Sequence, residues 1–479
     1  MAPSPSGFFH IGSARTALYN WLFARHSGGE FILRVEDTDA KRSSEDMIGV
    51  ILDGMKWLGL DWKEIHYQSR RTELYRQYLR QLLDRDLAYY CYCDPKELEK
   101  ERIDAYQKKV NWQYDRRCLK LTAEERLTRE KAQGRGAVRF LVPDRAVAYN
   151  DIVHGDIRRE AKDIEDFVIF RPDQTPTYNF ACVVDDHDMG ITHVIRGHDH
   201  ITNTPKQVLL CESFGWSPPQ FAHLPLILGK DKSKLSKRHG AVSIMEYKEQ
   251  GFLPEAVFNY IALLGWSPGD NREIMGREEL VAAFTLERIN SANAVFDVEK
   301  LEWMNQQYLL GYHAEPTRND DRILKLYGPV IVQMGFATEA QIDQDRRRII
   351  DICDLMAPRI KRLGEMQKAA YFFVDDFPCD DALVRKHRSE RTLAILGAFM
   401  VVLRELPAED FGDPAKGPAL IEACLKDFAQ NGNLKPKEII HPLRVAISGT
   451  DAGPGLYEMM QLVGKDRVKR RIEKFLSQK

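Results

Sequence analysis

The sequence predicts an α/β domain with a parallel sheet, followed by a long helical region. Three observations lead to this prediction. A helical pattern at residues 13–25 and an apolar strand at 31–35 follow one another near the N-terminus, and strand patterns return at 191–196 and 224–228. After Trp266 the apolar residues recur at helical spacing. Alternating helix and strand is typical of parallel α/β sheets, whereas helical patterns alone indicate a bundle.

The N-terminal elements follow from local patterns. Prolines and a glycine within residues 3–7 break regular structure before His10, and the helix at 13–25 is expected to end at Gly28 and Gly29. The strand at 31–35 leads into the acidic segment 36–39, so its carboxyl end is a place for polar side chains. Residues 73–171 are rich in charge and carry three spaced cysteines, which indicates an insertion in the α/β domain.

Two C-terminal helices are predicted from apolar spacing. Around 393–403 apolar residues surround the helix nearly completely, so we expect it to be buried in a bundle. The residues concerned are Leu393, Ala394, Ile395, Leu396, Met400, Val401, Val402 and Leu403. After Gly464 a last helix places Val468, Ile472 and Phe475 on one face.

The composition is that of an ordinary globular chain. Of 479 residues, 44% are hydrophobic and 29% charged, and no run of 18 apolar residues occurs, so neither disorder nor a membrane helix is expected. The start shows no basic segment followed by an apolar stretch, and eight scattered cysteines then indicate reduced thiols in the cytoplasm. The net charge of −2 leaves nucleic-acid binding to local basic patches. A single core rarely exceeds about 250–300 residues, so several domains are expected.

A first candidate site lies at His10-Ile11-Gly12-Ser13, where a glycine-containing loop enters a helix. Free backbone N–H groups and the helix dipole suit a phosphate there, and His10 adds a hydrogen bond. Gly12 has no side chain, so a nucleotide can lie against the backbone. Taken alone, the segment is equally well a proline-rich turn with a surface histidine.

A second candidate site is the basic segment 229–238, which contains Lys234 and Lys237. Flexible lysines can neutralise a polyphosphate during group transfer. Taken alone, such a charge run is more simply a solvated loop.

Together the two segments resemble the HIGH and KMSKS signatures of class I aminoacyl-tRNA synthetases. Further segments are similar to the bacterial glutamyl-tRNA synthetase family, in the same order and over essentially the whole chain. They are residues 2–7, 15–18, 31–39, 176–180, 191–197 and 443–449.

The resemblance implies a Rossmann-like catalytic domain and an ATP-dependent ligation of L-glutamate to tRNA-Glu through glutamyl-adenylate. His10, Gly12, Lys234 and Lys237 would be catalytic, and ATP, accompanied by Mg²⁺, would contact His10, Gly12, Ser13 and Lys237. The implied glutamate-binding residues are Ser4, Glu36, Tyr178 and Arg196. An ammonium group favours an acid and a carboxylate favours a guanidinium. Without the resemblance, Glu36 reads as a helix cap or surface acid and Arg196 as half of a structural ion pair.

Two positions depart from the family pattern. The family has a substrate-binding arginine two positions before the alanine matching Ala2, and Met1 occupies the intervening place. If the chain begins there, we expect weaker glutamate affinity, testable as KM with and without an arginine-bearing extension. The family's zinc site is matched by Cys91, Cys93 and Cys118, but Lys120 replaces its histidine. A protonated lysine cannot bind Zn²⁺, so a metal-free insertion is favoured, with Tyr114 or water completing a site as the alternative.

The remaining cysteines and the expected domains complete this description. Cys182, Cys211, Cys353, Cys379 and Cys424 are most simply small core residues. His198, Asp199 and His200 resemble a metal cluster, but the family match favours a loop of the nucleotide site. The expected organisation is a catalytic domain in two halves with an acceptor-binding insertion, a stem-contact region and two helical anticodon-binding parts. The bounds are 1–76 and 177–232 for the halves, 77–176 for the insertion, 233–313 for the stem-contact region, and 314–380 and 381–479 for the helical parts.

Several alternatives stay open. The enzyme would be a monomer without membrane attachment, and the sequence leaves undecided whether it also charges tRNA-Gln. A nucleotidyltransferase with a small acceptor has no need of the long helical C-terminus. A non-catalytic tRNA-binding paralogue has no need of intact His10, Gly12, Lys234 and Lys237.

Overall fold

The structure is a computed structural model that describes residues 1–4, 9–38, 45–110, 112–233, 235, 243–377, 379 and 381–477. Two candidate catalytic residues, Lys234 and Lys237, therefore lie outside the described residues. The chain forms two compact units. Unit 1 comprises Met1–Tyr247 with Val257–Val298, and unit 2 comprises Lys248–Ala256 and the chain from Glu299 onward.

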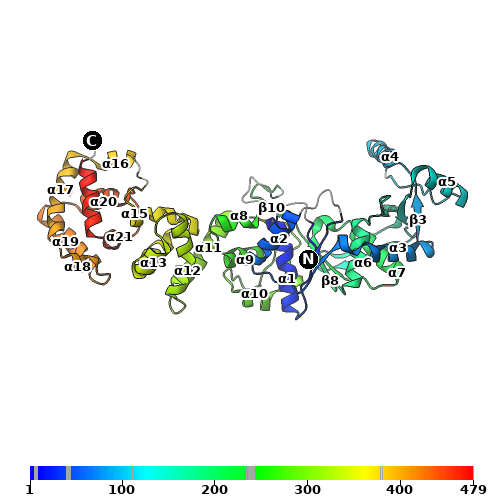
Figure 1. Cartoon of the computed structure of the whole chain (residues 1–479), viewed down its shortest axis with the longest axis horizontal. Coiled ribbons are helices and arrows are strands. Elements are labelled where there is room, and N and C mark those ends of the chain that lie inside the picture. The colour runs from blue at the N-terminus through cyan, green and yellow to red at the C-terminus, as the bar shows by residue number, and fades with distance from the viewer. Residues whose placement is uncertain are drawn as a thin grey trace. The chain divides into compact units, whose positions relative to one another are not determined.

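Unit 1 combines short strands with helices (Figure 1). Its strands are β1 (Leu33–Val35), β2 (Ile65–Tyr67), β3 (Ala88–Cys91), β4 (Ala137–Phe140), β5 (Val147–Asp151), β6 (Gly155–Arg159), β7 (Val168–Phe170), β8 (His193–Gly197), β9 (Gln220–Leu224), β10 (Ile227–Leu228) and β11 (Ala294–Val295). Its helices are α1 (Ile11–His26), α2 (Glu45–Trp57), α3 (Thr72–Asp84), α4 (Pro95–Gln107), α5 (Ala123–Gln133), α6 (Tyr178–Asp188), α7 (Thr204–Phe214) and α10 (Arg277–Ala283). Helices α8 (Ile244–Glu249), α9 (Pro254–Ala262) and α11 (Val298–His313) cross the division between the units.

The sheet that positions the site has the strand order β6-β5-β9-β8. Strand β9 pairs in parallel with β8 and, at Asp151 and Phe221, with β5, while β6 is an antiparallel edge strand. Strand β8 begins at His193 instead of residue 191, and the apolar run expected at 224–228 is divided between β9 and β10. Two strands from the segment expected to be an insertion, β5 and β6, thus share a sheet with β8 and β9. The domain bounds given above stay a prediction.

Helix α1 packs on this sheet. It is buried on almost all sides, because apolar residues lie on almost all of its faces. Ala14, Ala17, Leu18 and Leu22 are fully buried, and burial of a leucine side chain contributes about 1.5–3 kcal/mol. Gly28, with φ of +65°, follows the end of the helix in a conformation that favours glycine. The helix predicted at 13–25 is confirmed and extends to Ile11–His26.

A second, antiparallel sheet of unit 1 has the order β3-β4-β7. Helices α4 and α5 follow β3 along the chain, and α4 buries only Leu98 while α5 buries no side chain. Between these helices the chain returns to β3 and places Tyr114 and Cys118 against Tyr89 and Cys91 in a small core. The three cysteines noted in the sequence therefore meet at one end of this sheet.

Unit 2 is all helical from α11 onward among its described residues (Figure 1). Its helices are α12 (Asp320–Gln333), α13 (Glu339–Gln344), α14 (Arg346–Met356), α15 (Ala370–Phe373), α16 (Asp381–His387), α17 (Glu390–Glu405), α18 (Ala408–Gly412), α19 (Gly417–Asn431), α20 (Pro436–Ser448), α21 (Leu456–Val463) and α22 (Lys465–Ser477). One hydrophobic core runs through them. The amphipathic last helix is confirmed, because Val468, Ile472 and Phe475 of α22 are buried.

Two sequence expectations for burial were wrong. Helix α17 is not buried all round: Val401 is 60% exposed and Val402 is 38% exposed, because only the face with Leu396, Phe399 and Leu403 meets other helices. Cys379 is exposed and is no core residue, because it lies in the connection between α15 and α16. The fold class itself, an α/β domain followed by helical domains, is confirmed. In the part of the chain that the structure describes, no helix is both long and apolar enough to cross a bilayer.

Candidate active site

A cavity of about 1100 Å³ opens in unit 1 beside the start of α1 and the carboxyl ends of β1, β8 and β9. Ligands of open α/β sheets bind at such strand ends. The cavity gathers seven residues that the sequence analysis singled out. They are Ser4, His10, Gly12, Ser13, Glu36, Tyr178 and Arg196.

His10 is the N-cap of α1. Its Nδ1 accepts a hydrogen bond from the backbone N–H of Ser13 at 3.2 Å, and its Nε2 lies 3.2 Å from Ser13 Oγ. A Cβ on residue 12 would lie 3.0 Å from His10 Cε1, so glycine there lets the imidazole lie against the helix. The first N–H groups of an α-helix carry a partial positive charge that attracts phosphate. This end of the cavity is suited to the phosphates of a nucleotide.

The basic segment approaches the same cavity. Leu235 lines it, and the backbone N–H of Leu235 donates to Ile227 O at 3.2 Å, which holds the chain beside β10. Just before it, Asp231 forms a turn in which its Oδ1 accepts from the backbone N–H of Ser233 at 2.9 Å. Lys230 pairs with Asp297 at 3.1 Å.

Glu36 supplies a negative charge at the carboxyl end of β1. The thiol of Cys182 donates to its Oε1 at 3.1 Å, and Arg34 Nη2 lies 3.6 Å from the same oxygen. Burial raises the pKa of Glu36, and this effect exceeds the opposing attraction of Arg34. A cationic ligand group would therefore relieve an unfavourably buried carboxylate.

A buried charge network holds Glu36 in place, and the sequence analysis did not foresee it. Arg34 Nη1 donates to Asp186 at 2.6 Å, and Asp185 lies 3.7 Å from Arg34 Nε. Asp185 is fully buried and accepts hydrogen bonds from Gln68, Arg71 and Tyr75. The sequence did contain a sign of this network: two adjacent acids, Asp185 and Asp186, directly follow the apolar residues 180–184 of one helix. Helices seldom bury two carboxylates without a cationic partner.

Arg196 supplies a positive charge on β8. Its Nη1 donates to Tyr178 OH at 3.3 Å, its Nη2 donates to Thr204 Oγ1 at 2.7 Å, and its Nε donates to His223 Nε2 at 3.1 Å. Two of these partners, Tyr178 and Thr204, carry neutral hydroxyl groups, and the third, His223, can be neutral. Among the described residues Arg196 forms no ion pair. The structural ion pair considered for Arg196 is therefore absent from the described part of the chain. Thr204 and His223 were not foreseen, since neither belongs to a motif.

Tyr178 connects this arginine to the loop after β8. Its hydroxyl lies 3.0 Å from His200 Nδ1, and burial raises the pKa of Tyr178, so the phenol stays protonated. His198, Asp199 and His200 form the short 3-10 helix that follows β8, and they do not gather as a metal cluster in the described structure. Asp199 and His200 line the cavity.

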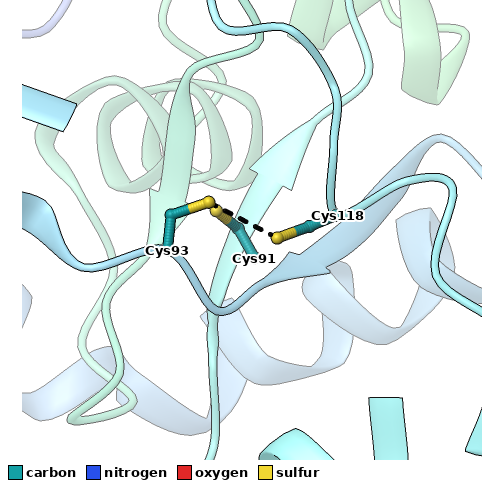
Figure 2. Close-up of side chains that lie close together, drawn as sticks. All are labelled: Cys91, Cys93 and Cys118. Carbon is teal, nitrogen blue, oxygen red and sulfur yellow. Dashed lines mark hydrogen bonds between the residues drawn. The ribbon is translucent and has the colours of Figure 1, made fainter. Parts of the chain in front are cut away.

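The three spaced cysteines meet outside this cavity. Figure 2 shows their sulfur atoms pointing toward one another, and all three lie within 4.8 Å. Cys93 Sγ lies 3.5 Å from Cys118 Sγ, and Tyr114 OH lies 3.5 Å from Cys91 Sγ and 3.4 Å from Cys93 Sγ. Lys120, at the position of the expected histidine, is exposed.

The cysteine–tyrosine geometry fits a tetrahedral zinc ion. With Zn–S near 2.3 Å and Zn–O near 2.0 Å, the edges of a tetrahedron measure about 3.8 Å between sulfurs and about 3.5 Å between sulfur and oxygen. The observed separations of 3.5 Å and 3.4–3.5 Å approach these values. The hydrogen bond with Cys118, assisted by Tyr114 and Arg139, lowers the pKa of Cys91 against the opposing effect of burial, and the lowered pKa favours its thiolate form.

Comparison with known proteins extends over the whole chain. The family model described as tRNA synthetases class I (E and Q), catalytic domain, matches residues 1–303, and a model described as anticodon binding domain matches residues 322–476. The chain is 42% identical to glutamate--tRNA ligase of Aquifex aeolicus, covering 99% of this chain and 98% of that protein. It is 41% identical to glutamate--tRNA ligase 2 of Caldicellulosiruptor saccharolyticus, with 99% and 97% covered.

A solved structure agrees with the sequence comparison. The crystal structure of a glutamate tRNA ligase from Elizabethkingia meningosepticum, determined in complex with its amino acid, superposes with a TM-score of 0.87 at 31% identity. The match covers 99% of this chain and 98% of that chain. The resemblance drawn from the two signatures is confirmed.

Proposed function

This chain belongs to the family of class I tRNA synthetases for glutamate and glutamine, and on that premise we propose that it is a glutamate–tRNA ligase, which joins L-glutamate to tRNA-Glu at the expense of ATP. The observation that carries the proposal is the pairing of charges in one cavity. Glu36 offers a carboxylate to an ammonium group, and Arg196 keeps its charge for a carboxylate. A helix N-terminus that suits phosphate lies in the same cavity.

The first step would form glutamyl-adenylate. An oxygen of the α-carboxylate of glutamate bonds to the α-phosphorus of ATP, the bond from that phosphorus to the bridging oxygen breaks, and pyrophosphate leaves with the electron pair. The carboxylate is already ionised, so the step needs no base and depends on alignment and charge neutralisation. His10 and the N-terminus of α1 would hold the nucleotide, and Lys234 and Lys237 would balance the charge of the departing pyrophosphate. ATP enters as its magnesium complex, and Mg²⁺ is thus part of the substrate.

The second step would transfer glutamate to tRNA. The terminal ribose hydroxyl of tRNA bonds to the activated carbonyl carbon, loses its proton, and AMP leaves with the electrons of the broken C–O bond. Glu36 and Arg196 hold glutamate through both steps, so the carbonyl stays in place while the leaving group changes. Ser4 and Tyr178, which line the same cavity as Glu36, are proposed to complete the glutamate site.

The cysteine cluster is proposed to hold one structural Zn²⁺. Cys91, Cys93 and Cys118 would supply thiolates and Tyr114 the fourth ligand, which the separations within the cluster support. Lys120 takes no part. The metal would fix β3 to the chain around Tyr114 and would supply no chemistry to the reaction. This reverses the preference for a metal-free insertion drawn from Lys120 alone, because the sequence does not show that Tyr114 approaches two of the sulfurs.

Unit 2 is proposed to bind the anticodon region of tRNA, and Arg444 is the candidate contact. Its side chain is buried, it forms no ion pair with a described acid, and its Nη1 has no hydrogen-bond partner there. Burial lowers the pKa of Arg444; Tyr371 opposes this effect and the charge of Arg359 adds to it. A buried guanidinium without a paired acid is unfavourable unless an electronegative ligand group completes it. Nucleic-acid phosphates and base edges offer such groups.

Aminoacylation tests the proposed function. Labelled glutamate and ATP would be supplied with purified tRNA-Glu and tRNA-Gln transcripts in separate reactions. Charging of tRNA-Glu alone is the expected result and defines a discriminating enzyme. Charging of both transcripts would define a non-discriminating enzyme. Charging of neither, in protein whose glutamate binding is intact by calorimetry, would refute ligation and favour the tRNA-binding paralogue.

A further inference from the structure

We propose that Asp151 and His223 are positioning residues for glutamate recognition, acting on Arg196 through a buried chain of hydrogen bonds. The proposal rests on the assignment of Arg196 to the glutamate site. Neither residue lines the cavity; His223 is paired with Arg196 across strands β9 and β8, and Asp151 contacts His223. Asp151 ends β5, His223 lies in β9 and Arg196 lies in β8, so three parallel strands each contribute one member.

The hydrogen bonds around Arg196 define the protonation of His223. A guanidinium is always a donor, so His223 Nε2, which lies 3.1 Å from Arg196 Nε, must present a lone pair. Thr204 Oγ1 accepts from Arg196 Nη2 at 2.7 Å and lies 3.0 Å from the same Nε2, so its own hydrogen is directed there as well. The proton of neutral His223 is therefore on Nδ1.

Asp151 is the group that keeps this tautomer. Its Oδ2 lies 2.5 Å from His223 Nδ1, and both side chains are fully buried. Its Oδ1 accepts from the backbone N–H groups of Val153 at 3.1 Å, His154 at 3.0 Å and His223 at 3.4 Å. Since both oxygens of the carboxylate accept hydrogen bonds, Asp151 is held in place and presents Oδ2 to the imidazole. Burial lowers the pKa of His223, in agreement with a neutral ring.

The neutral ring has a chemical advantage over a direct ion pair. A carboxylate in contact with Arg196 would occupy its N–H groups and compete with the carboxylate of glutamate. His223 instead accepts a hydrogen bond from Nε of Arg196 with a neutral nitrogen. The guanidinium is held in place, and its charge stays available to the ligand. In metal sites, likewise, the second ring nitrogen of a metal-binding histidine commonly donates to a carboxylate or carbonyl, which fixes the tautomer and the orientation of the ring.

The informative variant is Asp151→Asn. Oδ1 of asparagine can keep its backbone hydrogen bonds, but Nδ2 then donates to His223 Nδ1. The proton of His223 must move to Nε2, where it faces the N–H of Arg196, and two donors cannot pair. We expect KM for glutamate to rise about 10-fold to 100-fold, as small displacements of a binding group produce, with KM for ATP changed less than about 2-fold. The assay is ATP–pyrophosphate exchange with tRNA-Glu present throughout.

The chain offers a matched control in unit 2. His313 Nδ1 lies 2.5 Å from Asp354 Oδ1, a contact of the same length outside the cavity, in which Asp354 also pairs with Arg318 at 2.7 Å. Asp354→Asn is expected to lower the denaturant midpoint without changing KM for glutamate. A second pair of variants tests the acceptor: His223→Gln offers an amide oxygen to Arg196 and should keep KM within about 5-fold of the wild type, whereas His223→Leu should match Asp151→Asn.

The outcomes separate the inference from the proposed function. If the wild type shows no glutamate-dependent exchange, the proposed function fails. If the wild type is active and Asp151→Asn lowers stability as Asp354→Asn does but leaves KM for glutamate unchanged, Asp151 and His223 are merely structural and the inference is overturned. Equal rises in KM for ATP and glutamate would overturn it as well. A rise for glutamate alone, together with a ¹⁵N histidine spectrum showing the Nδ1-protonated ring in wild type and its loss in Asp151→Asn, is the supporting result.

Discussion

Replacing Arg196 by lysine tests whether directional hydrogen bonds, beyond charge, select glutamate. A guanidinium has five N–H groups, and three of them donate to Tyr178, Thr204 and His223, which leaves one on each terminal nitrogen for a ligand. Lysine keeps the positive charge but offers no paired donors in a fixed plane. Loss of one charge-assisted hydrogen bond costs about 1.5–3 kcal/mol, and each 1.36 kcal/mol is a factor of about ten. We therefore expect KM for glutamate to rise about 10-fold to 150-fold in Arg196→Lys.

The assay is glutamate-dependent ATP–pyrophosphate exchange in the presence of tRNA-Glu, with ATP saturating. Arg145→Lys is the control, because Arg145 is exposed, lies outside the cavity and pairs with Glu212. An Arg196→Lys enzyme with wild-type KM for glutamate would show that charge alone suffices and would refute the reasoning from the hydrogen bonds. A rise in KM for ATP of the same size would equally contradict it, since the ATP end of the cavity is formed by α1.

Four further predictions concern other parts of the chain. Gly12→Ala brings a methyl group to 3.0 Å from His10 Cε1 and should lower kcat about 10-fold or more, measured by exchange at saturating glutamate. Glu36→Gln should raise KM for glutamate about 10-fold or more, yet leave the free energy of unfolding at pH 7 undiminished, because burial raises the pKa of Glu36 and so disfavours its ionised form. Purified protein should contain one zinc per chain by metal analysis, and Cys93→Ser should lose the metal and lower Tm. Arg444→Ala should raise KM for tRNA-Glu in aminoacylation by about 10-fold without lowering Tm.

The sign of the Glu36 prediction follows from linkage. A carboxyl group whose pKa is higher in the folded state binds its proton more tightly there, so stability falls as pH rises from the unfolded pKa through the folded pKa. Wild type should therefore gain stability relative to Glu36→Gln when pH is lowered through this window, as measured by urea unfolding. A wild type that is more stable than Glu36→Gln at pH 7 would contradict the assignment of Glu36 as an unfavourably buried acid.

Each of the other three predictions has a contradicting outcome. Unchanged kcat in Gly12→Ala would mean that His10 does not depend on the space beside it. Zinc well below one per chain in protein purified without chelator would restore the metal-free interpretation of the insertion. A reduced Tm with unchanged KM for tRNA-Glu in Arg444→Ala would make Arg444 a residue of the core.

Local patterns were sufficient for much of the architecture. The helix at the N-terminus, the strand that ends just before Glu36 and the last helix were predicted from apolar spacing, because each buries one face or all faces at a regular period. The two signatures resembled class I synthetases, further segments along the chain resembled the glutamyl family, and the family match confirms this. Periodicity failed for α17, where Val401 and Val402 are apolar but exposed. A single helix does not reveal which of its apolar faces another helix will cover.

The sequence by itself determined the family, the order of α/β and helical regions, and seven polar or glycine positions of the cavity lining. These features can be predicted from short segments, because the residues that produce them are close together along the chain. Only the tertiary structure decided which buried side chains hold the cavity residues in place. Arg34 meets Asp186 from 152 positions away, and His223 meets Asp151 from 72 positions away. The first pair joins strand β1 to helix α6, and the second joins the parallel strands β5 and β9. Both depend on tertiary packing and on the cost of burying a charge without a partner, and neither leaves a pattern in the local sequence.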